Sequence, residues 1–411
     1  MTKEFFKVTD LDNALELRFG FKRLAQEEIP IYESTGRILA EDIESDVDLP
    51  DFSRAIMDGF AVRAASTFGA SDGNPAYLNV PRTIAMGEMP SFSIGPGEAA
   101  RISTGGMLPE GADSVVMIEH TGAIDETTIE VYKSVAPGQH MVAIGEDIEK
   151  DCTILFRGQR LRPQETGLLA AFGRSSVRVF RKPVIGIIST GDEIVPVHES
   201  PAVGKIRDIN AYTLAGQIIQ AGGIPRQFGI VKDDYAALLA LCTHSLEQSD
   251  MLLVSGGSSV GMRDYTVEVL SAIPDADLLL HGISISPGKP TILAKIADKA
   301  FWGLPGHVVS AMVVFHAVVL PFIDHVGGLE PAYHRRPACM ATLNRSVASS
   351  QGRVDYIRVK LIEENGHFTA EPILGKSGLI NTMLRADGLV KIDKHTEGLD
   401  ENTQVKVLLF T

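Results

Sequence analysis

Between Ser249 and Ser310 the chain repeats one pattern that restricts its fold more than any other feature. An apolar run, Met251–Val254, leads into a glycine-rich segment, Ser255–Gly261, and two further turns follow at Ser286–Pro290 and Gly303–His307. Glycine lets the backbone approach a ligand closely and accepts positive φ, and backbone N–H groups in such turns can hold an anion. We therefore predict a buried strand that ends in a glycine-rich loop, with the two other turns at the same edge.

Two charged side chains lie in these turns, the carboxylate of Asp264 and the ammonium of Lys289. Together with backbone N–H donors they suit a phosphorylated ligand that carries a metal ion. A single glycine-rich turn is weak support for such a site, because many turns contain paired glycines. Three turns, each at the end of an apolar run, carry more weight.

Apolar strands alternate with helices from Lys182 onward. We expect strands at 184–188, 225–231 and 251–254, and helices at 210–221 and 234–247. This alternation predicts a mostly parallel sheet covered on both faces, a three-layer α/β/α domain. Ligands of such sheets bind beyond the carboxyl ends of the strands, where this chain places the segments 189–193, 232–234 and 255–264.

The whole chain reads as an α/β multidomain protein, because 411 residues exceed the size of one core. We expect a mixed, partly helical N-terminal domain in two pieces (1–51 and 151–181) and a β-rich domain inserted between them (52–150). The α/β domain follows at 182–327 and a C-terminal β-barrel at 328–411. Helices are expected at 9–20, 34–39, 163–172 and 308–322, and a strand at 42–49.

Net charge and the N-terminus limit the possible partners and location. The formal charge of −14 argues against binding of nucleic acid through a basic surface. The three cysteines are far apart and imply neither a zinc site nor a disulfide framework. The first residues lack a signal-peptide core, and we expect no apolar run to reach the ~18 residues that span a bilayer. A cytoplasmic protein without membrane contact is the expectation.

Several candidate residues also have simpler interpretations. Asp58, with the glycine that follows it, could form only a tight turn. Asp233 could cap the next helix. Lys289 could be an exposed surface lysine and Arg353 a charge at a strand edge. Glu193 and Asp264 follow two predicted parallel strands and are the best candidates for metal ligands.

Short motifs in one order along the chain resemble those of the molybdopterin molybdenumtransferases, the MoeA type that includes the gephyrin E domain. They are Met57–Ala61, Ser103–Gly105, Gly145–Ile148, Ser189–Glu193, Ser255–Gly261, Asp264-Tyr265, Pro287–Pro290 and Leu304–Gly306. The resemblance covers essentially the whole chain and implies a homodimer of four-domain subunits. It also implies a reaction in which adenylylated molybdopterin and molybdate give molybdenum cofactor and AMP with the help of Mg²⁺.

The resemblance assigns roles to residues of this chain. Those expected in catalysis are Asp58, Thr104, Asp147, Glu193, Asp264 and Lys289, and those expected to bind Mg²⁺ are Glu193, Asp264 and Asp233. Substrate binding is expected at Ser255, Gly256, Gly257, Ser258, Gly261, Ser286, Pro305, Gly306, His307, Ser310, Arg353 and Ser377. Two anions can meet at such a site only where cations and N–H donors offset their repulsion.

This chain departs from the family pattern at two positions. Ser286 stands where the family usually has a lysine, and His307 stands where it has an asparagine, followed by Val308 in place of a proline. The lost lysine lowers the positive charge, which a protonated His307 could partly restore. Tungstate could therefore replace molybdate as the substrate.

Two other classes of protein compete with the enzyme. The same scaffold could be a catalytically weakened paralogue that binds pterin or a peptide. A generic nucleotide-binding protein is the third hypothesis, and the missing GxxxxGK[ST] motif argues against an ATPase.

Overall fold

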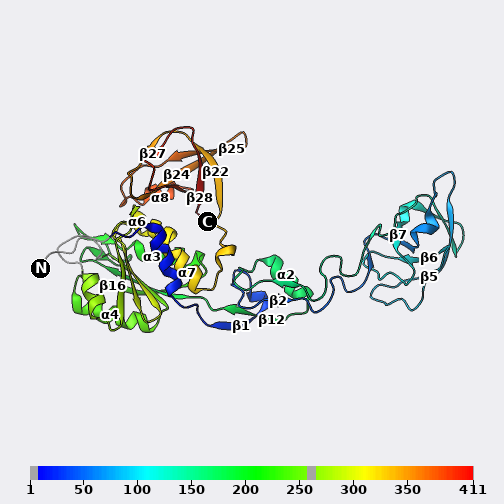
Figure 1. Ribbon diagram of the computed structural model, residues 1–411, viewed down its shortest axis with the longest axis horizontal. Helices are drawn as coiled ribbons and strands as arrows, with labels where there is room; N and C mark the ends of the chain where they lie inside the picture. Colours follow the sequence, from blue (N-terminus) through cyan, green and yellow to red (C-terminus); the bar gives the residue numbers. More distant parts are fainter. Residues whose placement is uncertain (1–7, 257–264, 411) are drawn as a thin grey trace. The chain divides into compact units, whose positions relative to one another are not determined.

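The computed structural model describes residues 8–256 and 265–410. They form two compact units, each described here by itself. One unit comprises residues up to Glu41, Arg157–Gly167 and everything from Arg174 onward, and the other comprises Asp42–Phe156 and Leu168–Gly173. Figure 1 labels the elements along the chain. Our division into four domains remains a prediction.

A six-stranded sheet forms the centre of the first unit, in the order β16-β13-β17-β21-β20-β18. The first four strands run parallel and the last two antiparallel. Their bounds are β13 (Val184–Thr190), β16 (Ile224–Val231), β17 (Met251–Ser255), β18 (Ala276–His281), β20 (Ile292–Ile296) and β21 (Lys299–Leu304). The mostly parallel sheet predicted from the sequence is thus confirmed.

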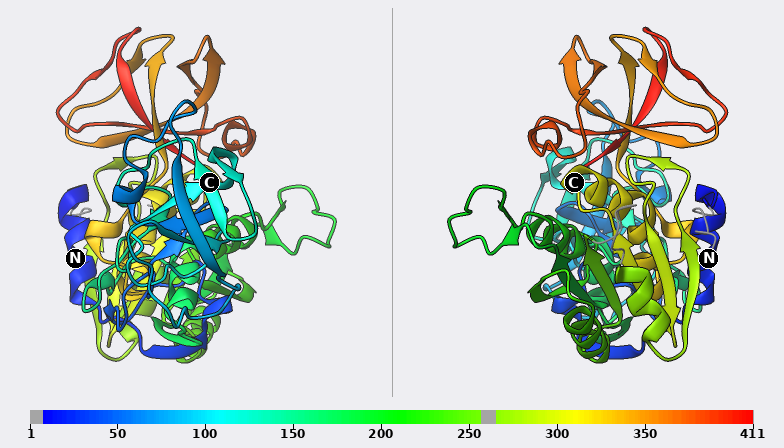
Figure 2. Two further views of the ribbon diagram at one scale, coloured as in Figure 1. Left: turned by 90° about the vertical axis from the view of Figure 1, so that its right-hand side faces the viewer. Right: turned by 90° about the vertical axis from the view of Figure 1, so that its left-hand side faces the viewer.

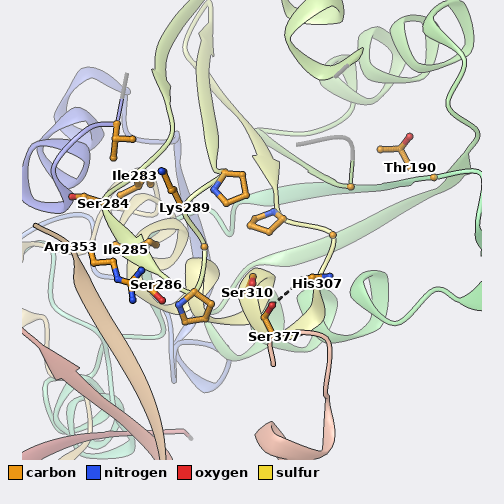
Figure 3. Close-up of a pocket in the computed structure, with 18 of the residues that line it drawn as sticks. Thr190, Ile283, Ser284, Ile285, Ser286, Lys289, His307, Ser310, Arg353 and Ser377 are labelled. Atoms are coloured by element: carbon orange, nitrogen blue, oxygen red, sulfur yellow. Dashed lines mark hydrogen bonds between the residues drawn. The ribbon is translucent and has the colours of Figure 1, made fainter. Parts of the chain in front are cut away.

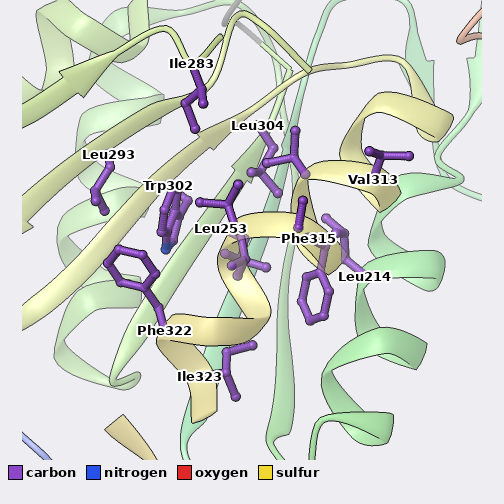
Figure 4. Close-up of a cluster of buried hydrophobic side chains, with 14 of the residues drawn as sticks. Leu214, Leu253, Ile283, Leu293, Trp302, Leu304, Val313, Phe315, Phe322 and Ile323 are labelled. Atoms are coloured by element: carbon purple, nitrogen blue, oxygen red, sulfur yellow. The ribbon is translucent and has the colours of Figure 1, made fainter. Parts of the chain in front are cut away.

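Helices cover both faces of this sheet. One face carries α3 (Asn210–Gln220) and a long apolar helix, and the other carries α4 (Tyr235–Glu247) and α5 (Tyr265–Ala272). On the first face Leu214, Phe315 and Phe322 pack with Leu253 and Trp302 of the sheet (Figure 4). On the second face, helix residues such as Leu238 and Val269 form a separate cluster with the strands. These are the three expected layers.

The long helix comprises α6 (Val308–Val314), a π-helical turn (Phe315–Val319) and α7 (Leu320–Val326). This helix of 19 residues is long enough and on average apolar enough to cross a bilayer, although it contains His316 and Asp324, so the expectation that no run reaches this length was wrong. However, 83% of its apolar window is buried inside the protein. A core helix meets the same length criterion, and Phe322 packs edge-on against Trp302 with ring centroids 4.9 Å apart.

The C-terminal strands close into a barrel, as predicted. The strands pair in the cycle β24-β25-β22-β28-β26 and back to β24, and they are coloured orange to red in Figure 2. Their bounds are β22 (Ala338–Leu343), β24 (Val354–Glu364), β25 (His367–Pro372), β26 (Gly388–Ile392) and β28 (Gln404–Leu409), with the short pair β23 (Val347–Ala348) and β27 (Gly398–Leu399) beside them. The barrel also contains the short helix α8 (Asn381–Leu384).

One strand of the barrel sheet comes from the α/β part of the chain. This strand, β19 (Ile285–Ser286), pairs parallel with β24, so that Ile285 lies opposite Val354 and Ser286 opposite Asp355. Val354 N–H also donates to the Ser284 carbonyl at 2.9 Å. Main-chain bonds therefore fix the turn after Ile283 against the start of β24.

The N-terminal part of the first unit joins the α/β core. Its helix α1 (Leu11–Glu16) begins at Asp10, whose side chain accepts from Asp12 N–H, and ends in a 3₁₀ turn, Leu17–Gly20. Leu11 lies in the same core cluster as the sheet. Further along, β1 (Gln26–Pro30) pairs antiparallel with β12 (Ser176–Phe180). The helix α2 (Pro163–Ala171) begins in this unit, and its residues from Leu168 onward belong to the second unit.

Two local predictions were wrong, one at the end of the first unit's N-terminal part and one at the start of the second unit. Ser34–Leu39 is not helical: Gly36 has φ +82, which ends the preceding turn, and Ile38 and Leu39 form β-bridges instead. Only β2 (Ile43–Glu44), which pairs with β11 (Thr153–Leu155), forms within the strand expected at 42–49. In both segments, pairing with distant residues replaced the local preference.

The second unit is β-rich, as expected. Its six-stranded sheet has the order β7-β4-β6-β5-β9-β8. The bounds are β4 (Gly59–Val62), β5 (Ala76–Thr83), β6 (Glu98–Ile102), β7 (Ser114–Met117), β8 (Thr121–Ala123) and β9 (Thr128–Val131), and a small pair joins β3 (Arg54–Ala55) to β10 (Met141–Val142). Val62, Val116 and Val131 are fully buried in its core.

Candidate functional site

A cavity of about 1180 Å³ lies beyond the carboxyl ends of the parallel strands and extends to the start of β24. Figure 3 shows residues that line it. The cavity brings together many of the residues expected to bind substrate or metal: Glu193, Asp233, Gly256, Ser286, Lys289, Pro305, Gly306, His307, Ser310, Arg353 and Ser377. The three turns singled out in the sequence thus contribute to one cavity, apart from the part of the first turn that lies beyond Gly256.

Two carboxylates lie at the strand ends on one side of the cavity. Asp233 accepts a hydrogen bond from Thr190 Oγ1 at 3.2 Å, which holds it at the end of β13. Its neighbour Asp234 accepts from Ala237 N–H at 2.7 Å and is the cap of α4. The capping interpretation therefore applies to Asp234, whereas Asp233 lines the cavity.

Glu193 reaches the cavity because the residue two before it is a glycine. A Cβ built on Gly191 would lie 2.7 Å from Glu193 Oε2, which is inside van der Waals contact. Gly191 also has φ +152. Glu193 follows β13, as the sequence predicted for a residue at a parallel strand end.

The turn that carries Lys289 depends on Gly288. This glycine has φ +121, and a Cβ placed on it would lie 2.4 Å from Val314 Cγ2 of α6. The backbone around Lys289 is fixed by Ile283 N–H and Thr291 N–H, which donate to the Lys289 carbonyl at 3.0 and 2.9 Å. The Lys289 side chain is exposed at the cavity, so it is surface-accessible but held by an ordered turn.

A buried carboxylate orients Arg353, which lies beside Ser286 on the cavity wall (Figure 3). Arg353 Nε donates to Asp355 Oδ1 at 2.9 Å and Nη2 donates to Asp355 Oδ2 at 3.3 Å. Asp355 is 4% exposed and also accepts from Ser349 Oγ at 2.8 Å. Arg353 is therefore a positioned cation rather than a free charge at a strand edge, and its Nη1 makes no hydrogen bond to the residues that the structure describes.

His307 contacts the barrel's loop. Its Nδ1 lies 2.8 Å from Ser377 Oγ, shown as a dashed line in Figure 3. The Ser377 carbonyl accepts from Val309 N–H at 3.1 Å, in the first turn of α6. Side chain and main chain of Ser377 thus hold this loop at the helix start that opens onto the cavity.

Asn210 is a residue of the site that the sequence reading missed. Its Nδ2 donates to Ser255 Oγ at 2.5 Å and to the Gly306 carbonyl at 2.9 Å. It thereby links the end of β17 to the turn after β21. Ser255, expected to bind substrate, is 2% exposed and does not line the cavity. Its hydroxyl instead accepts this structural hydrogen bond.

The remaining predicted residues fall into two groups. Gly257, Ser258, Gly261 and Asp264 are outside the described residues. In the second unit, Thr104 N–H and Thr104 Oγ1 donate to Asp58 Oδ1 at 2.7 and 3.0 Å. These bonds, the backbone one first, lower the pKa of Asp58 below its usual value. Asp147, in the same unit, is exposed, and its N–H donates to the Leu49 carbonyl at 3.1 Å.

The carboxylates of the cavity match one kind of metal site. Within 8–256 and 265–410, no three His, Cys, Asp or Glu side chains cluster closely enough to bind an ion by themselves. Glu193 and Asp233 nevertheless line the same cavity. Mg²⁺ usually keeps several waters and takes one or two protein carboxylates together with substrate phosphates. This pair therefore fits Mg²⁺ better than it fits an ion that requires a full protein cage.

Comparison with known proteins agrees with this geometry. Residues 9–173 match the MoeA N-terminal region, 186–325 match a molybdopterin binding domain model, and 340–410 match the MoeA C-terminal region. The molybdopterin molybdenumtransferase of Bacillus subtilis is 34% identical over 97% of this chain and 94% of its own.

Two crystal structures of MoeA proteins from Pyrococcus horikoshii share the fold. Each covers 98% of this chain and 100% of its own, with 39% identity and a TM-score of 0.81 for one, and 30% identity and a TM-score of 0.85 for the other. The fold and its relatives mark the protein as a transferase of molybdenum cofactor biosynthesis, and the chain belongs to the MoeA family.

Proposed function

We propose that this chain is a molybdopterin molybdenumtransferase, which takes adenylylated molybdopterin and molybdate and releases AMP and molybdenum cofactor. The observation that carries the proposal is the cavity at the carboxyl edge of the sheet. It places two carboxylates, Glu193 and Asp233, and two cations, Lys289 and Arg353, around one space of about 1180 Å³. A volume of this size accommodates a substrate larger than a simple metabolite.

The cations of the cavity suit the two anionic groups of the reaction. Arg353 keeps a fixed orientation through Asp355, so its remaining N–H groups can donate to an oxoanion without a large loss of side-chain entropy. Lys289 extends from the ordered turn on the neighbouring segment. Charge-assisted hydrogen bonds from both would offset the repulsion between molybdate and the diphosphate.

Mg²⁺ is part of the proposal. Glu193 and Asp233 would hold it, joined by Asp264 as the sequence predicts. Bound by these carboxylates, it would supply Lewis-acid chemistry that offsets the negative charge of the diphosphate. The protein contributes the positions of these carboxylates: Gly191 leaves room for the Glu193 side chain, and the Thr190 hydroxyl donates to Asp233.

A homodimer and a cytoplasmic location also remain proposals. They rest on the resemblance to the family. Equilibrium sedimentation should give about twice the 44.3 kDa mass of the chain. A monomer at micromolar concentration would contradict the dimer.

Release of AMP tests the reaction directly. The purified chain is incubated with adenylylated molybdopterin, Mg²⁺ and either molybdate or tungstate, and AMP is followed by chromatography. We expect release that requires both the oxoanion and the metal and stops with a chelator. A reaction with tungstate alone would support the tungstate alternative. If no AMP were released with either oxoanion, the proposed transferase activity would be refuted. The alternative of a paralogue that only binds pterin or a peptide would then be favoured, although the names of the relatives do not support it.

A further inference from the structure

A second cavity, of about 650 Å³, lies beside the middle of the long helix. It shares no lining residue with the cavity described above. Its walls come from α3, the π-helical turn and α7, and from residues of the segments 35–36, 159–165, 329–337 and 409–410. The volume is within the ~300–1,000 Å³ range of ligand pockets.

The charges of this cavity are unbalanced. Four arginines line it, against the carboxylates of Glu165 and Asp324. Arg162 Nη2 donates to Glu165 Oε1 at 2.5 Å, and Arg160 Nη2 donates to Asp324 Oδ1 at 3.3 Å. Each carboxylate is thus already paired with an arginine. In a chain with a net charge of −14, a cavity with excess positive charge is unexpected.

The two remaining arginines, Arg335 and Arg336, are adjacent. Arg336 Nη1 donates to the His316 carbonyl at 3.0 Å, which is a neutral partner. Among the residues the structure describes, no carboxylate lies within 4.0 Å of either guanidinium. Burial lowers the pKa of Arg336, while the charge of Asp324 acts in the opposite direction. An anion in the cavity would give these two guanidinium groups a direct charged partner.

The cavity also contains unpaired polar atoms and an apolar surface. His316 Nε2 and Gln217 Oε1 are buried and have no hydrogen-bond partner within the described part of the chain. Burial lowers the pKa of His316 and that of His334 to about 4, so both rings are neutral at pH 7 and the arginines alone carry the positive charge. Leu320, Leu409 and Phe410 provide apolar surface.

The helix is locally irregular at this cavity. Phe315–Val319 forms a π-helical turn, and Phe315 and His316 from it line the wall. Such turns are rare and are found frequently at functional sites. The irregularity therefore coincides with the excess charge and the unpaired polar atoms.

We propose that this second cavity binds a small amphipathic acid, a molecule with an apolar body and one anionic group that pairs with Arg335 and Arg336. The apolar body packs on Leu320, Leu409 and Phe410, and a polar atom of the ligand meets His316 Nε2. The anionic group is a carboxylate or a phosphate, because both match the planar guanidinium. The inference does not depend on the reaction proposed above.

Calorimetric titration of the full chain tests this inference with three probes of one shape. 2-Naphthoate and 2-naphthyl phosphate carry the two candidate anions, and 2-naphthamide carries no charge. At about pH 7.5 we expect one of the acids to bind with unit stoichiometry and at least roughly tenfold more tightly than the amide, the factor that corresponds to one charge-assisted hydrogen bond. The tighter acid identifies the anionic group.

Variants locate the binding. Arg336→Gln and Arg335→Gln should each weaken binding of the acid, the first by about tenfold or more, whereas Arg336→Lys, which keeps the charge and controls for misfolding, should retain most of it. Arg226→Gln, a surface arginine outside the cavity, and Lys289→Gln, in the other cavity, should bind as the unmodified chain does. Four results would each overturn the proposal. The amide could bind as tightly as the acids, or the acids could fail to bind at about 1 mM. Binding could be lost in Lys289→Gln, or it could be unaffected by both Arg335→Gln and Arg336→Gln.

Discussion

Replacement of Gly288 by alanine should destabilise the α/β part of the chain and reduce the reaction together. Gly288 has φ +121, and an added Cβ would lie 2.4 Å from Val314 Cγ2. A non-glycine residue at such φ costs about 1–3 kcal/mol, and an overpacked methyl group costs about 1–3 kcal/mol more. The expected loss is therefore about 2–6 kcal/mol, a large part of a typical stability of about 5–15 kcal/mol.

Thermal unfolding followed by circular dichroism measures this loss. With about 2–4 °C per kcal/mol for a domain of this size, the midpoint should fall by at least about 4 °C. Activity should fall as well at temperatures where the variant is folded, because relief of the contact moves the turn that carries Lys289.

Gly204→Ala is the matched control for the backbone term. Gly204 has φ +83 but no atom within 4 Å of its would-be Cβ, so only the conformational cost applies. Val314→Ala in the Gly288→Ala background removes the atom at 2.4 Å and should recover part of the lost activity. If Gly288→Ala were as stable as Gly204→Ala and fully active, the steric argument would be refuted.

Three further predictions concern charge. Glu193→Gln should slow metal-dependent AMP release by on the order of 10²–10³, while pterin binding, followed by fluorescence, persists; unchanged turnover would make Glu193 structural. Ser286→Lys should tighten molybdate binding by roughly 1–2 kcal/mol, which calorimetric titration measures; an unchanged affinity would place this position away from the oxoanion. Burial raises the pKa of Asp324 from 3.8 to about 6. The protonated Asp324 side chain therefore contributes to the free energy of unfolding fully below pH 3.8, and this contribution is lost as the pH rises through about 6. Asp324→Asn should remove this dependence and raise the unfolding free energy at pH 7 by roughly 1–3 kcal/mol, and a pH-independent difference in melting temperature would contradict it.

The α/β sheet was predictable because its strands are buried on both faces. Runs such as Val184–Ile188 and Met251–Val254 are apolar throughout, and the helices between them have clear starts and stops. Asp234 and Gly222 mark such ends and lie where expected. The segment Ser34–Leu39 lacked this support, because its apolar residues are buried by bridges to residues far along the chain.

The sequence predicted the turns of the candidate site, but it did not predict the hydrogen bonds and strand pairing that join these turns. Glycine, proline and charge mark the turns directly in the sequence. Asn210 gave no such signal, because a polar residue at a helix start is ordinarily taken for a cap, and its two partners are 45 and 96 residues away. Likewise β19 is only two residues long, which is too short for any periodic pattern. Asp355 has the appearance of an ordinary polar residue within a strand, so the sequence did not show that it orients Arg353.

The two-residue strand β19 affects how this site can change in evolution. Because Ile285 and Ser286 join β24 through the main chain, the attachment of the turn to the barrel does not depend on which side chains stand at 286 and 353. Exchange of lysine for serine at 286 can then alter the charge presented to an oxoanion while the wall itself stays in register. Paralogues with different anion preferences could arise by such exchanges, without a new loop or a new fold.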